Sequence, residues 1–597
     1  MPTTIEVNKQ SVEALLGSGK SKPFVIPEYQ RPYAWTDEQV ETLFEDLWDF
    51  TATSGGTERE SSYFLGSVVS YENEDGEQEI IDGQQRITSL FLLLRAIYTK
   101  LVATPASERT AEANNFIGKI EPTIWRTNKL TGTVDFKNIL LTSRVVNNEG
   151  NEILRSILET GKADEDAKDN YSKNYRHFQE LFDKHSTENP LMVYQFIYAL
   201  LNQAILLPIT ADTQDTALTI FSTLNDRGLP LSDADIFKAK IYNQLAPDDK
   251  KAFIDRWKDL DEQSTDANES IQQLFYYNMF YYRALDKDTK TTTPGVRKYY
   301  AVNKFERLYK PELLDTLFVI LNLWKVVNKG EELEDEAWSK NIKIRQTLDI
   351  LTSYPNEYWK YPVVIYYVCY RNEENFETRF ARFLNKLLME LMTKYLMIPT
   401  INAVKPDILK LNSAIVASDI PTFEFKTVDM TQLEPYIQNP NRNVVRMLLK
   451  TLAYEHQDDL LPAKWEIEHI FPQKWQTNYF PDEPDATIKE KIEHIGNKLP
   501  FEKKLNIVAG NGYFGKKKKE YIASKIVITK AMGTSDVMDW NLESITKRDI
   551  RVSDEVVKIM NRWNNEYLNT PVCEGKAGEP SEEELAQIEK FKKNGWI

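Results

Sequence analysis

The stretch WEIEHIFPQKW at residues 465–475, followed by IEHIGNKLPFEKKLNIVAGNGYFGKKKKEYIAS at residues 492–524, decides the fold expected for the last third of the chain. The first segment is typical of a strand that Pro472 ends. Glu468 and His469 are adjacent, so on a strand their side chains would point to opposite faces. A twist or a turn would then have to bring both to one substrate.

The residue types in these segments favour phosphodiester chemistry. Hydrolysis of a phosphodiester needs a base beside the water and a cation on the phosphate. His469 can supply the base, and the amide oxygens of Asn497 and Asn506 can bind a cation or orient the imidazole. Lys516–Lys519 lie on a predicted helix, where they could contact phosphate oxygens.

Local charge agrees with contact to a polyanion. The chain as a whole has a formal net charge of −16, which argues against a general nucleic-acid coat protein. From Lys498 to Lys530, however, there are nine Lys against two Glu, a balance of +7. The simpler alternative is that His469 is a core histidine and that the asparagines cap loops. The order of His, Pro, Gly-Asn, Asn and Lys cluster favours the catalytic interpretation, and His494 stays open between a structural and a supporting role.

This pattern resembles the HNH (ββα-metal) nuclease domain at the carboxy end of GmrSD-type modification-dependent restriction enzymes. The resemblance implies that His469 is the general base and that Asn497 braces the loop that follows it. It implies that Glu468 and Asn506 bind the metal, Mg²⁺ or Mn²⁺. Asp is common where Glu468 stands, and Asn511 is an alternative to Asn506, which we favour.

A second motif lies near the amino terminus, where residues 79–97 read EIIDGQQRITSLFLLLRAI. The pattern predicts a strand, a tight turn at Asp82-Gly83, and a helix. Gln84, Gln85 and Arg86 would stand at the helix start, where free backbone N–H groups favour an anion. Arg86 adds a planar fork suited to phosphate. The alternative is an ordinary strand-to-helix turn with surface glutamines.

Four segments in this order resemble the amino-terminal domain of the same GmrSD family: IPEYQRPYAW (26–35), YFLGSVV (63–69), IDGQQRITSL (81–90) and FSTLNDRGLPLSDADIFKAKI (221–241). That domain is similar to the ParB/sulfiredoxin fold and binds and hydrolyses nucleoside triphosphates; the phosphorothioate-sensing SspE proteins share it. The resemblance implies these nucleotide-site residues: Asp82, Gly83, Gln84, Gln85 and Arg86 at the triphosphate and its Mg²⁺, Tyr29, Gln30 and Arg31 in the nucleotide or modified-DNA pocket, and Asn225, Arg227 and Gly228 closing the site.

Two further features of this region have competing interpretations. The loop EYQRPYAW mixes Arg31 with aromatic residues, which suits stacking on a base, although the aromatics could instead fill the core. The sequence GSGKS at 17–21 ends like a P-loop, but residue 14, where a Gly is required, is Ala. We therefore do not expect a P-loop.

Length and composition predict three domains in a mixed α+β, predominantly helical chain. We expect a ParB-like nucleotide-binding domain with a helical insertion at 1–245, a helical domain at 246–440, and an HNH nuclease domain with carboxy-terminal helices at 441–597. Two cysteines in 597 residues, no signal-peptide pattern and no long apolar run predict a cytoplasmic protein without a membrane segment.

Together these features predict an NTP-regulated, metal-dependent endonuclease that cleaves modified foreign DNA, such as phage DNA. The nucleotide would be GTP, ATP or another NTP, and the partner would be double-stranded DNA. A homodimer would suit cleavage of both strands by a single-site nuclease. The alternative is a nucleotide-switched DNA-binding or sensing protein of phosphorothioate-type defence, with weak or vestigial nicking activity.

Overall fold

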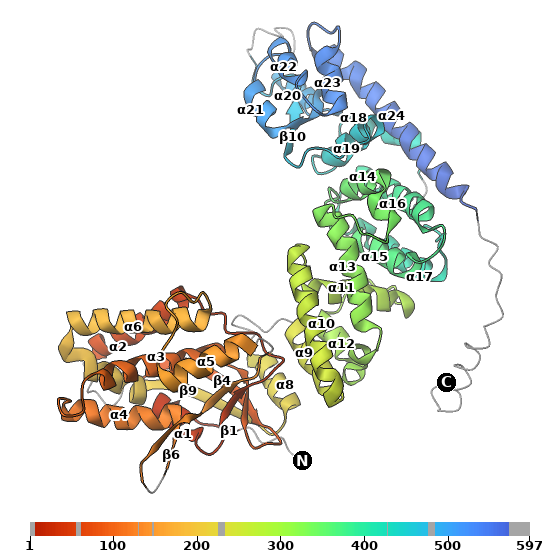
Figure 1. Cartoon of the computed structure of the whole chain (residues 1–597). Coiled ribbons are helices and arrows are strands. Elements are labelled where there is room, and N and C mark those ends of the chain that lie inside the picture. Colours follow the sequence, from red (N-terminus) through yellow and green to blue (C-terminus); the bar gives the residue numbers. More distant parts are fainter. Residues whose placement is uncertain are drawn as a thin grey trace, which may run out of the picture. The chain divides into compact units, whose positions relative to one another are not determined.

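The computed structural model describes residues 6–54, 61–128, 131–145, 148–224, 233–426, 428–475 and 484–571. The chain divides into two compact units (Figure 1). The first holds Met1–Asp259 and Phe305–Tyr309, and the second holds Leu260–Lys304 and Lys310–Ile597. The predicted class, mixed α+β and predominantly helical, is confirmed. The residues expected to form a middle helical domain and a nuclease domain lie mostly together in the second unit.

The first unit is built around a sheet that, within the described residues, has seven strands in the order β1-β9-β4-β5-β3-β8, with β2 also pairing with β9. β4 and β5 are antiparallel, whereas β4 pairs with β9, and β3 with both β5 and β8, in parallel. The strands are β1 (Glu6–Val7), β2 (Gln10–Ser11), β3 (Phe24–Ile26), β4 (Tyr63–Glu72), β5 (Gln78–Asp82), β8 (Leu141–Ser143) and β9 (Ala204–Ala211). A separate pair is formed by β6 (Trp125–Thr127) and β7 (Val134–Ile139).

Helices cover both faces of the sheet, as the burial of strand β5 indicates. Successive residues of a strand point to opposite faces. Ile80 and Ile81 of β5 are nevertheless both almost completely buried, and they belong to different core clusters. One cluster includes residues of α2, α3, α4 and α6, and the other includes residues of α8 and α9. The sheet is therefore a central layer between helices.

The helices of the first unit are buried to different extents. α3 is the most enclosed, with Leu90 to Leu94 fully buried, and it packs against α6 and α4. The helices are α1 (Val12–Ser18), α2 (Asp37–Ser54), α3 (Gln84–Ala103), α4 (Ala111–Ile124), α5 (Asn148–Thr160), α6 (Asn170–Glu188), α7 (Val193–Tyr198), α8 (Gln214–Leu224) and α9 (Asp233–Gln244), while α10 (Pro247–Asp266) continues into the second unit.

The strand–turn–helix predicted at Asp82-Gly83 is confirmed. β5 ends at Asp82, Gly83 takes a left-handed conformation with φ of 88°, and α3 begins at Gln84. A Cβ atom at Gly83 would lie 3.1 Å from Cγ2 of Val68. Glycine is therefore favoured here both by its backbone angle and by the close approach of β4.

The second unit is helical, with one small hairpin in its last part. Its helices are α11 (Ile271–Leu285), α12 (Val296–Tyr300), α13 (Leu313–Lys329), α14 (Ile342–Leu351), α15 (Lys360–Tyr370), α16 (Phe376–Met397), α17 (Lys405–Ala417), α18 (Glu434–Gln438), α19 (Val445–His456), α20 (Asp485–Ile492), α21 (Lys503–Ala509), α22 (Phe514–Tyr521), α23 (Val527–Thr534) and α24 (Leu542–Leu568). The hairpin consists of β10 (Trp465–His469) and β11 (Lys498–Glu502).

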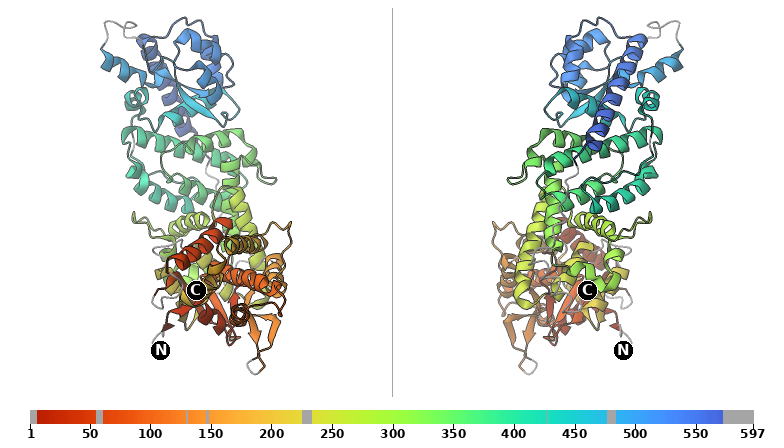
Figure 2. Two further views of the ribbon diagram at one scale, coloured as in Figure 1. Left: turned by 90° about the vertical axis from the view of Figure 1, so that its left-hand side faces the viewer. Right: turned by 90° about the vertical axis from the view of Figure 1, so that its right-hand side faces the viewer.

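The long helix α24 connects the parts of the second unit. Its N-terminus is capped by Asn541, whose Oδ1 accepts a hydrogen bond from the Ser544 amide at 2.9 Å. A buried stripe at helical spacing then runs along it: Ile545, Val552, Val556, Met560, Trp563 and Tyr567. Figures 1 and 2 show α24 at the dark-blue end of the colour bar, and its contacts extend from the turn before β11 to α18 and α16. One helix therefore supports both the hairpin and the helical layer.

Among the helices of the described residues, none has the length and the apolar composition needed to cross a membrane.

Candidate functional site

The β10–β11 hairpin places His469 at its end. His469 is the last residue of β10 and lies opposite Lys498, the first residue of β11. α21 begins directly after β11, so the segment has the order strand, strand, helix. Glu468, one residue earlier, points to the other face and is 4% exposed, whereas the imidazole side chain of His469 retains 16% exposure. The strand geometry therefore separates the two side chains.

Asn497 holds the segment that follows His469. Its side chain is fully buried. Its Oδ1 accepts a hydrogen bond from the Phe471 amide at 2.7 Å, and its Nδ2 donates to the carbonyls of Phe471 and Ile492, each at 3.1 Å. The Asn497 carbonyl also accepts from the Ile470 amide at 2.8 Å. These bonds give Asn497 the bracing position that the sequence assigned to it.

The short turn that carries Asn497, Ile495–Asn497, is fixed in turn by Asp549 of α24. Asp549 is 1% exposed, and its Oδ1 accepts from the Gly496 amide at 2.7 Å. Its Oδ2 lies 2.8 Å from Nδ1 of His494 and 3.0 Å from Nζ of Lys491. A buried carboxylate with three partners is well satisfied. His494 therefore has a structural contact, one of the two roles left open for it.

Arg548, the neighbour of Asp549, donates hydrogen bonds to the backbone carbonyl groups of the same turn. Its Nη1 donates to the carbonyl oxygens of Ile495, Gly496 and Lys498 at 3.1, 2.8 and 2.9 Å. A Cβ atom at Gly496 would lie 2.3 Å from the carbonyl oxygen of Ile545, so only glycine permits this approach. The Gly-Asn pair seen in the sequence thus combines close packing against α24 with the brace of the loop.

Burial lowers the pKa of His469 below its usual 6.5, and Lys498 and Lys517 lower it further, while Glu493 alone acts to raise it. Oε1 of Glu493 lies 3.5 Å from Nε2 of His469, and Nε2 of Gln473 lies 3.4 Å from the same nitrogen. The imidazole is therefore neutral at pH 7, the form that can accept a proton.

Glu468 lies in a buried cluster with α22. Its Oε1 is 2.8 Å from Nζ of Lys517 and accepts a hydrogen bond from the Tyr521 hydroxyl at 2.7 Å. Lys517 is 2% exposed, and it also donates to the carbonyl of His469. Burial lowers the pKa of Lys517, and the carboxylate of Glu468 opposes this shift. Glu468 therefore balances a buried ammonium group, a role that the sequence did not predict.

The two candidate asparagines have different surroundings. Nδ2 of Asn506 lies 3.3 Å from Oε2 of Glu466, whose side chain is 41% exposed. Asn511 instead uses both of its amide atoms on Lys474: its Nδ2 donates to the Lys474 carbonyl at 2.6 Å, and its Oδ1 accepts from the Lys474 amide at 3.2 Å. The geometry therefore favours Asn506 over Asn511 as a residue with a donor oxygen to spare.

Of the predicted lysine cluster, Lys516 and Lys519 are exposed, whereas Lys517 is buried against Glu468. Lys518 donates to the carbonyls of Ser535 and Val537. Phosphate contact from this helix is thus left to two of the four side chains.

The start of α3 is the second candidate site, and its glutamines fasten a neighbouring loop. Oε1 of Gln85 accepts from the amides of Ala34 and Trp35 at 2.7 and 3.3 Å, and its Nε2 donates to the Pro32 carbonyl at 3.2 Å. Nε2 of Gln84 donates to the Arg31 carbonyl at 3.3 Å, while its buried Oε1 has no hydrogen-bond partner in the described residues. The simpler alternative treated these glutamines as surface residues, but both are buried.

Charged groups gather beside this helix start. Arg86 donates from Nη1 to the Ser67 carbonyl at 3.0 Å and packs so closely on Gly66 that a Cβ there would lie 2.9 Å from Nη1. Burial raises the pKa of Asp82, although the Gly83 amide, Arg86 and Arg31 act against the shift. Burial lowers the pKa of Arg86, and Asp82 acts against it. Arg31 is exposed.

The aromatic residues of the loop at 28–35 are part of the core. Tyr29 is 4% exposed, donates to Oε1 of Glu79 at 2.6 Å and accepts from Gln214 at 2.6 Å. Gln30 donates from Nε2 to the Ile81 carbonyl at 3.1 Å, and Tyr33 is 7% exposed. Tyr29 and Tyr33 therefore fill the core, which was the alternative to base stacking.

Two sequence features need only brief comment. Asn225, Arg227 and Gly228 lie outside the described residues. The GSGKS sequence falls where α1 ends at Ser18, not at the start of a helix, so it lacks the geometry of a P-loop, as expected.

Two family models match the chain. The GmrSD restriction endonuclease N-terminal domain matches residues 12–242, and the GmrSD restriction endonuclease C-terminal domain matches residues 429–552. The chain belongs to the GmrSD family of restriction endonucleases. Its substrate is therefore DNA, and both candidate sites fall inside the matched ranges. A search of curated proteins found no significant match.

The donor set of this GmrSD endonuclease fits a divalent cation at one pair of residues. Glu466 and Asn506 present a carboxylate and an amide beside each other, with Lys503 paired to Glu466 at 3.5 Å on the exposed surface. Mg²⁺ is commonly bound by one or two protein oxygen donors together with substrate phosphate. Glu468 fits less well, because Lys517 neutralises it at 2.8 Å. In the described part of the chain, no cluster of three or more His, Cys, Asp or Glu side chains is suited to a metal.

Sequence reasoning missed Arg548 and Asp549, although one signal was present. Both lie between Ile545 and Val552, on the buried stripe of an amphipathic helix. Charged residues on an apolar stripe need buried partners, and here the partners are the backbone and side chains of residues 491–498.

We predict that cleavage of DNA loses rate only on the acid side of pH 6.5, because the active form of His469 is neutral and burial lowers its pKa. Replacing Glu493 with Gln removes the carboxylate that raises this pKa. The acid limb of the pH–rate profile should therefore move to still lower pH.

The profile should be measured for the wild type, E493Q and the control E490Q, whose side chain is exposed on α20. A limb that moves to higher pH in E493Q, or that moves equally in E490Q, would contradict the assignment.

Proposed function

We propose that this GmrSD endonuclease is NTP-regulated and metal-dependent and that it cleaves modified foreign DNA, such as phage DNA. The observation that carries the proposal is a partly exposed imidazole at the end of a hairpin whose following loop is fixed by Asn497. An imidazole with this exposure, beside Glu493 and Gln473, suits proton transfer in the hydrolysis of a phosphodiester.

In the proposed reaction, His469 accepts a proton from a water molecule as the water oxygen attacks phosphorus. The bond from phosphorus to the leaving sugar oxygen then breaks. Asn497 keeps the loop of His469 in place, so the imidazole does not have to be ordered when substrate binds. The exposed Lys516 and Lys519 would contact backbone phosphates and position the strand.

A divalent cation, Mg²⁺ or Mn²⁺, would supply positive charge for the leaving oxygen when bound. Asn506 and Glu466 would hold it, since their side chains lie within hydrogen-bond distance. Glu468, the ligand suggested by family resemblance, could take part only if Lys517 released its carboxylate.

The amino-terminal unit would bind a nucleoside triphosphate, GTP, ATP or another, at the start of α3. The amides of Gln84, Gln85 and Arg86 are the first of that helix and have no carbonyl one turn earlier within it. Arg86 and Arg31 would add charge for the phosphates, and the unpartnered Oε1 of Gln84 would accept a hydrogen bond from a hydroxyl or amino group. Modified double-stranded DNA would be recognised in combination with this nucleotide.

One observation favours a second candidate function, a nucleotide-switched DNA-binding or sensing protein with weak or vestigial nicking. The ion pair between Glu468 and Lys517 occupies a carboxylate that the family resemblance gave to the metal. If the site bound no cation, the chain would still bind DNA but cleave it slowly.

Replacing His469 with Ala should reduce cleavage of modified plasmid DNA by about 10²–10⁴-fold, the usual contribution of a general base. Affinity for the same DNA, measured without a divalent cation, should stay unchanged. H177A, which changes a histidine of α6 in the other unit, is the control. Normal cleavage by H469A would refute the assignment of the base.

The cation proposal is tested by comparing E466Q with E468Q in Mg²⁺ titrations of DNA cleavage. We expect E466Q to raise the Mg²⁺ concentration for half-maximal rate about tenfold or more, since it removes a ligand. E468Q should chiefly lower the thermal stability of the protein, because it leaves Lys517 buried without its counter-ion. The opposite ranking of the two Mg²⁺ titrations would return the ligand role to Glu468.

For the nucleotide site, R86A should lower NTP turnover, because it removes the guanidinium at the helix start. R86K keeps the charge without the planar fork and should recover only part of the turnover. The control is R144A, an exposed arginine paired with Glu77 at 2.8 Å. Turnover of GTP and ATP that is unchanged in R86A would rule out the α3 site.

A further inference from the structure

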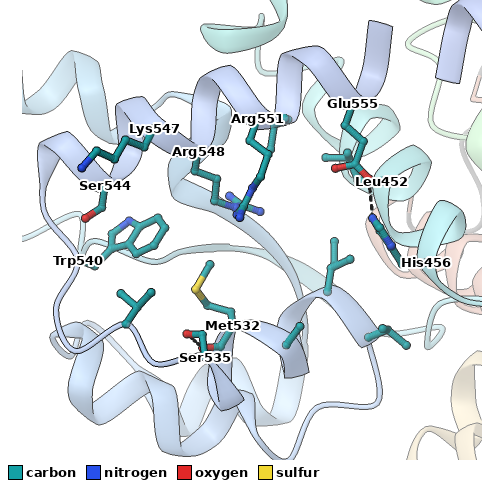
Figure 3. Close-up of a pocket in the computed structure, with 15 residues that line it drawn as sticks. Leu452, His456, Met532, Ser535, Trp540, Ser544, Lys547, Arg548, Arg551 and Glu555 are labelled. Carbon is teal, nitrogen blue, oxygen red and sulfur yellow. Dashed lines mark hydrogen bonds and ion pairs between the residues drawn. The ribbon is translucent and has the colours of Figure 1, made fainter. Parts of the chain in front are cut away.

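A cavity lies in the carboxy-terminal part of the chain. It is enclosed by α19, α23 and α24 and has a volume of about 570 Å³ (Figure 3). Pockets of this size hold small organic ligands. Its lining residues lie between Leu452 and Glu555 in the sequence, and each of them is a described residue of the second unit.

One part of the cavity is apolar. Leu452, Ile528, Met532, Val537, Trp540 and Val552 contribute side chains to it. Figure 3 shows Met532 and Trp540 extending into the space below α24. Val527 and Val537, at 43% and 37% exposure, leave apolar surface open to solvent. Such a surface suits a planar aromatic group, which would displace water from it.

The wall formed by α24 is cationic. Lys547 and Arg551 are one turn apart, and Arg548 lies between them (Figure 3). Lys547 is paired only with the exposed Glu543, and within the described residues no hydrogen bond or ion pair engages Arg551. Burial and the nearby charge of Arg551 lower the pKa of Arg548 to about 10, while Asp549 and Glu555 act to raise it. Arg551, which has no partner of its own in the described residues, favours an anion.

The acidic residue of the cavity does not cancel this charge. Glu555 lies eight residues, or roughly 12 Å, along the helix from Lys547 and one turn from Arg551. Its Oε1 is 2.5 Å from Nε2 of His456, so it already has a partner. The anion would therefore bind toward Lys547 and Arg551.

A buried polar group supplies an independent sign of a missing ligand. Nε1 of Trp540 is buried and has no hydrogen-bond partner in the described residues, and the side chain is 5% exposed. A buried indole N–H normally finds an acceptor. A ligand with an acceptor atom on its aromatic ring would provide one.

We propose that this cavity binds a nucleotide, with the base against Met532 and Trp540 and the phosphate at Lys547 and Arg551. A nucleotide combines the three properties that the walls select: a planar aromatic group, ring acceptor atoms and an anion. It can come from two sources, a free nucleotide in solution or a nucleotide of the DNA substrate turned out of the helix.

The site is placed to influence cleavage. Arg548 lines the cavity, and its Nη1 holds the carbonyls of residues 495, 496 and 498, which flank Asn497. An anion that bound near Arg548 would therefore act on the turn that braces the loop of His469. This coupling rests on the proposed function, whereas nucleotide binding itself does not.

Binding is tested on the full chain without a divalent cation, so that the result is independent of cleavage. The first arm is calorimetry with 2′-deoxyguanosine 5′-monophosphate and with ATP. The second arm is the fluorescence of a DNA duplex that carries 2-aminopurine, which increases when the base leaves the stack. Inorganic phosphate is the competitor in both arms.

Two variants should weaken binding tenfold or more: R551A, which removes charge, and A531W, which fills the cavity and leaves every charge in place. W540F should weaken it less, since it removes only the N–H donor. R562A, an arginine of the same helix that pairs with Glu455, should change nothing in this signal. Thermal melting should confirm that R551A is folded.

Loss of the calorimetric signal in R551A and A531W would identify a free nucleotide, and loss of the 2-aminopurine signal alone would identify a nucleotide of the DNA. The proposal is overturned if neither probe gives a signal that these variants reduce. It is also overturned if inorganic phosphate competes as well as the nucleotide, because the apolar wall would then have no part in binding.

Discussion

The candidate active site depends on the contact between α24 and the turn at residues 495–497. Asp549 and Arg548 bind both the amide and the carbonyl groups of this turn, and the turn places Asn497 under the loop of His469. The loop of His469 is therefore held through a turn whose own partners lie about fifty positions after it in the chain. Because the supporting charges are buried and fully partnered, weakening any one of them leaves another unsatisfied.

Charge is distributed differently around the two carboxylates of β10. Glu468 faces inward and balances Lys517, whereas Glu466 remains partly exposed beside Asn506. Alternation along the strand places both carboxylates on one face and His469 on the other, so the two differ through their partners and not through their face. Glu468 pairs with Lys517 and stabilises the packing of α22 on the hairpin, whereas Glu466 lies beside Asn506 with Lys503 at 3.5 Å. Two glutamates of one strand thus have different surroundings: Glu468 is part of the packing, and Glu466 is the one proposed to bind a cation.

Much of this architecture could be predicted from the sequence, because it depends on local patterns. The turn at Gly83, the strands around 72–77 and the position of Asn497 follow from turn chemistry, alternation and motif order. What could not be predicted were partners distant in sequence. No local pattern predicts that Lys517 pairs with Glu468, or that Gln85 binds the amides of residues 34 and 35. Side-chain contacts of this kind depend on the tertiary fold. They explain why Lys517 and Gln85, which are polar, are buried.

The central claim is that Asn497 fixes the loop of His469 for catalysis. The most direct measurement is the single-turnover rate of DNA cleavage by N497A, with DNA affinity and melting temperature measured alongside. The account predicts a rate at least a hundredfold lower, on the order of 3 kcal/mol in the barrier, with DNA affinity retained and the chain still folded. Cleavage at the wild-type rate by folded N497A would contradict it.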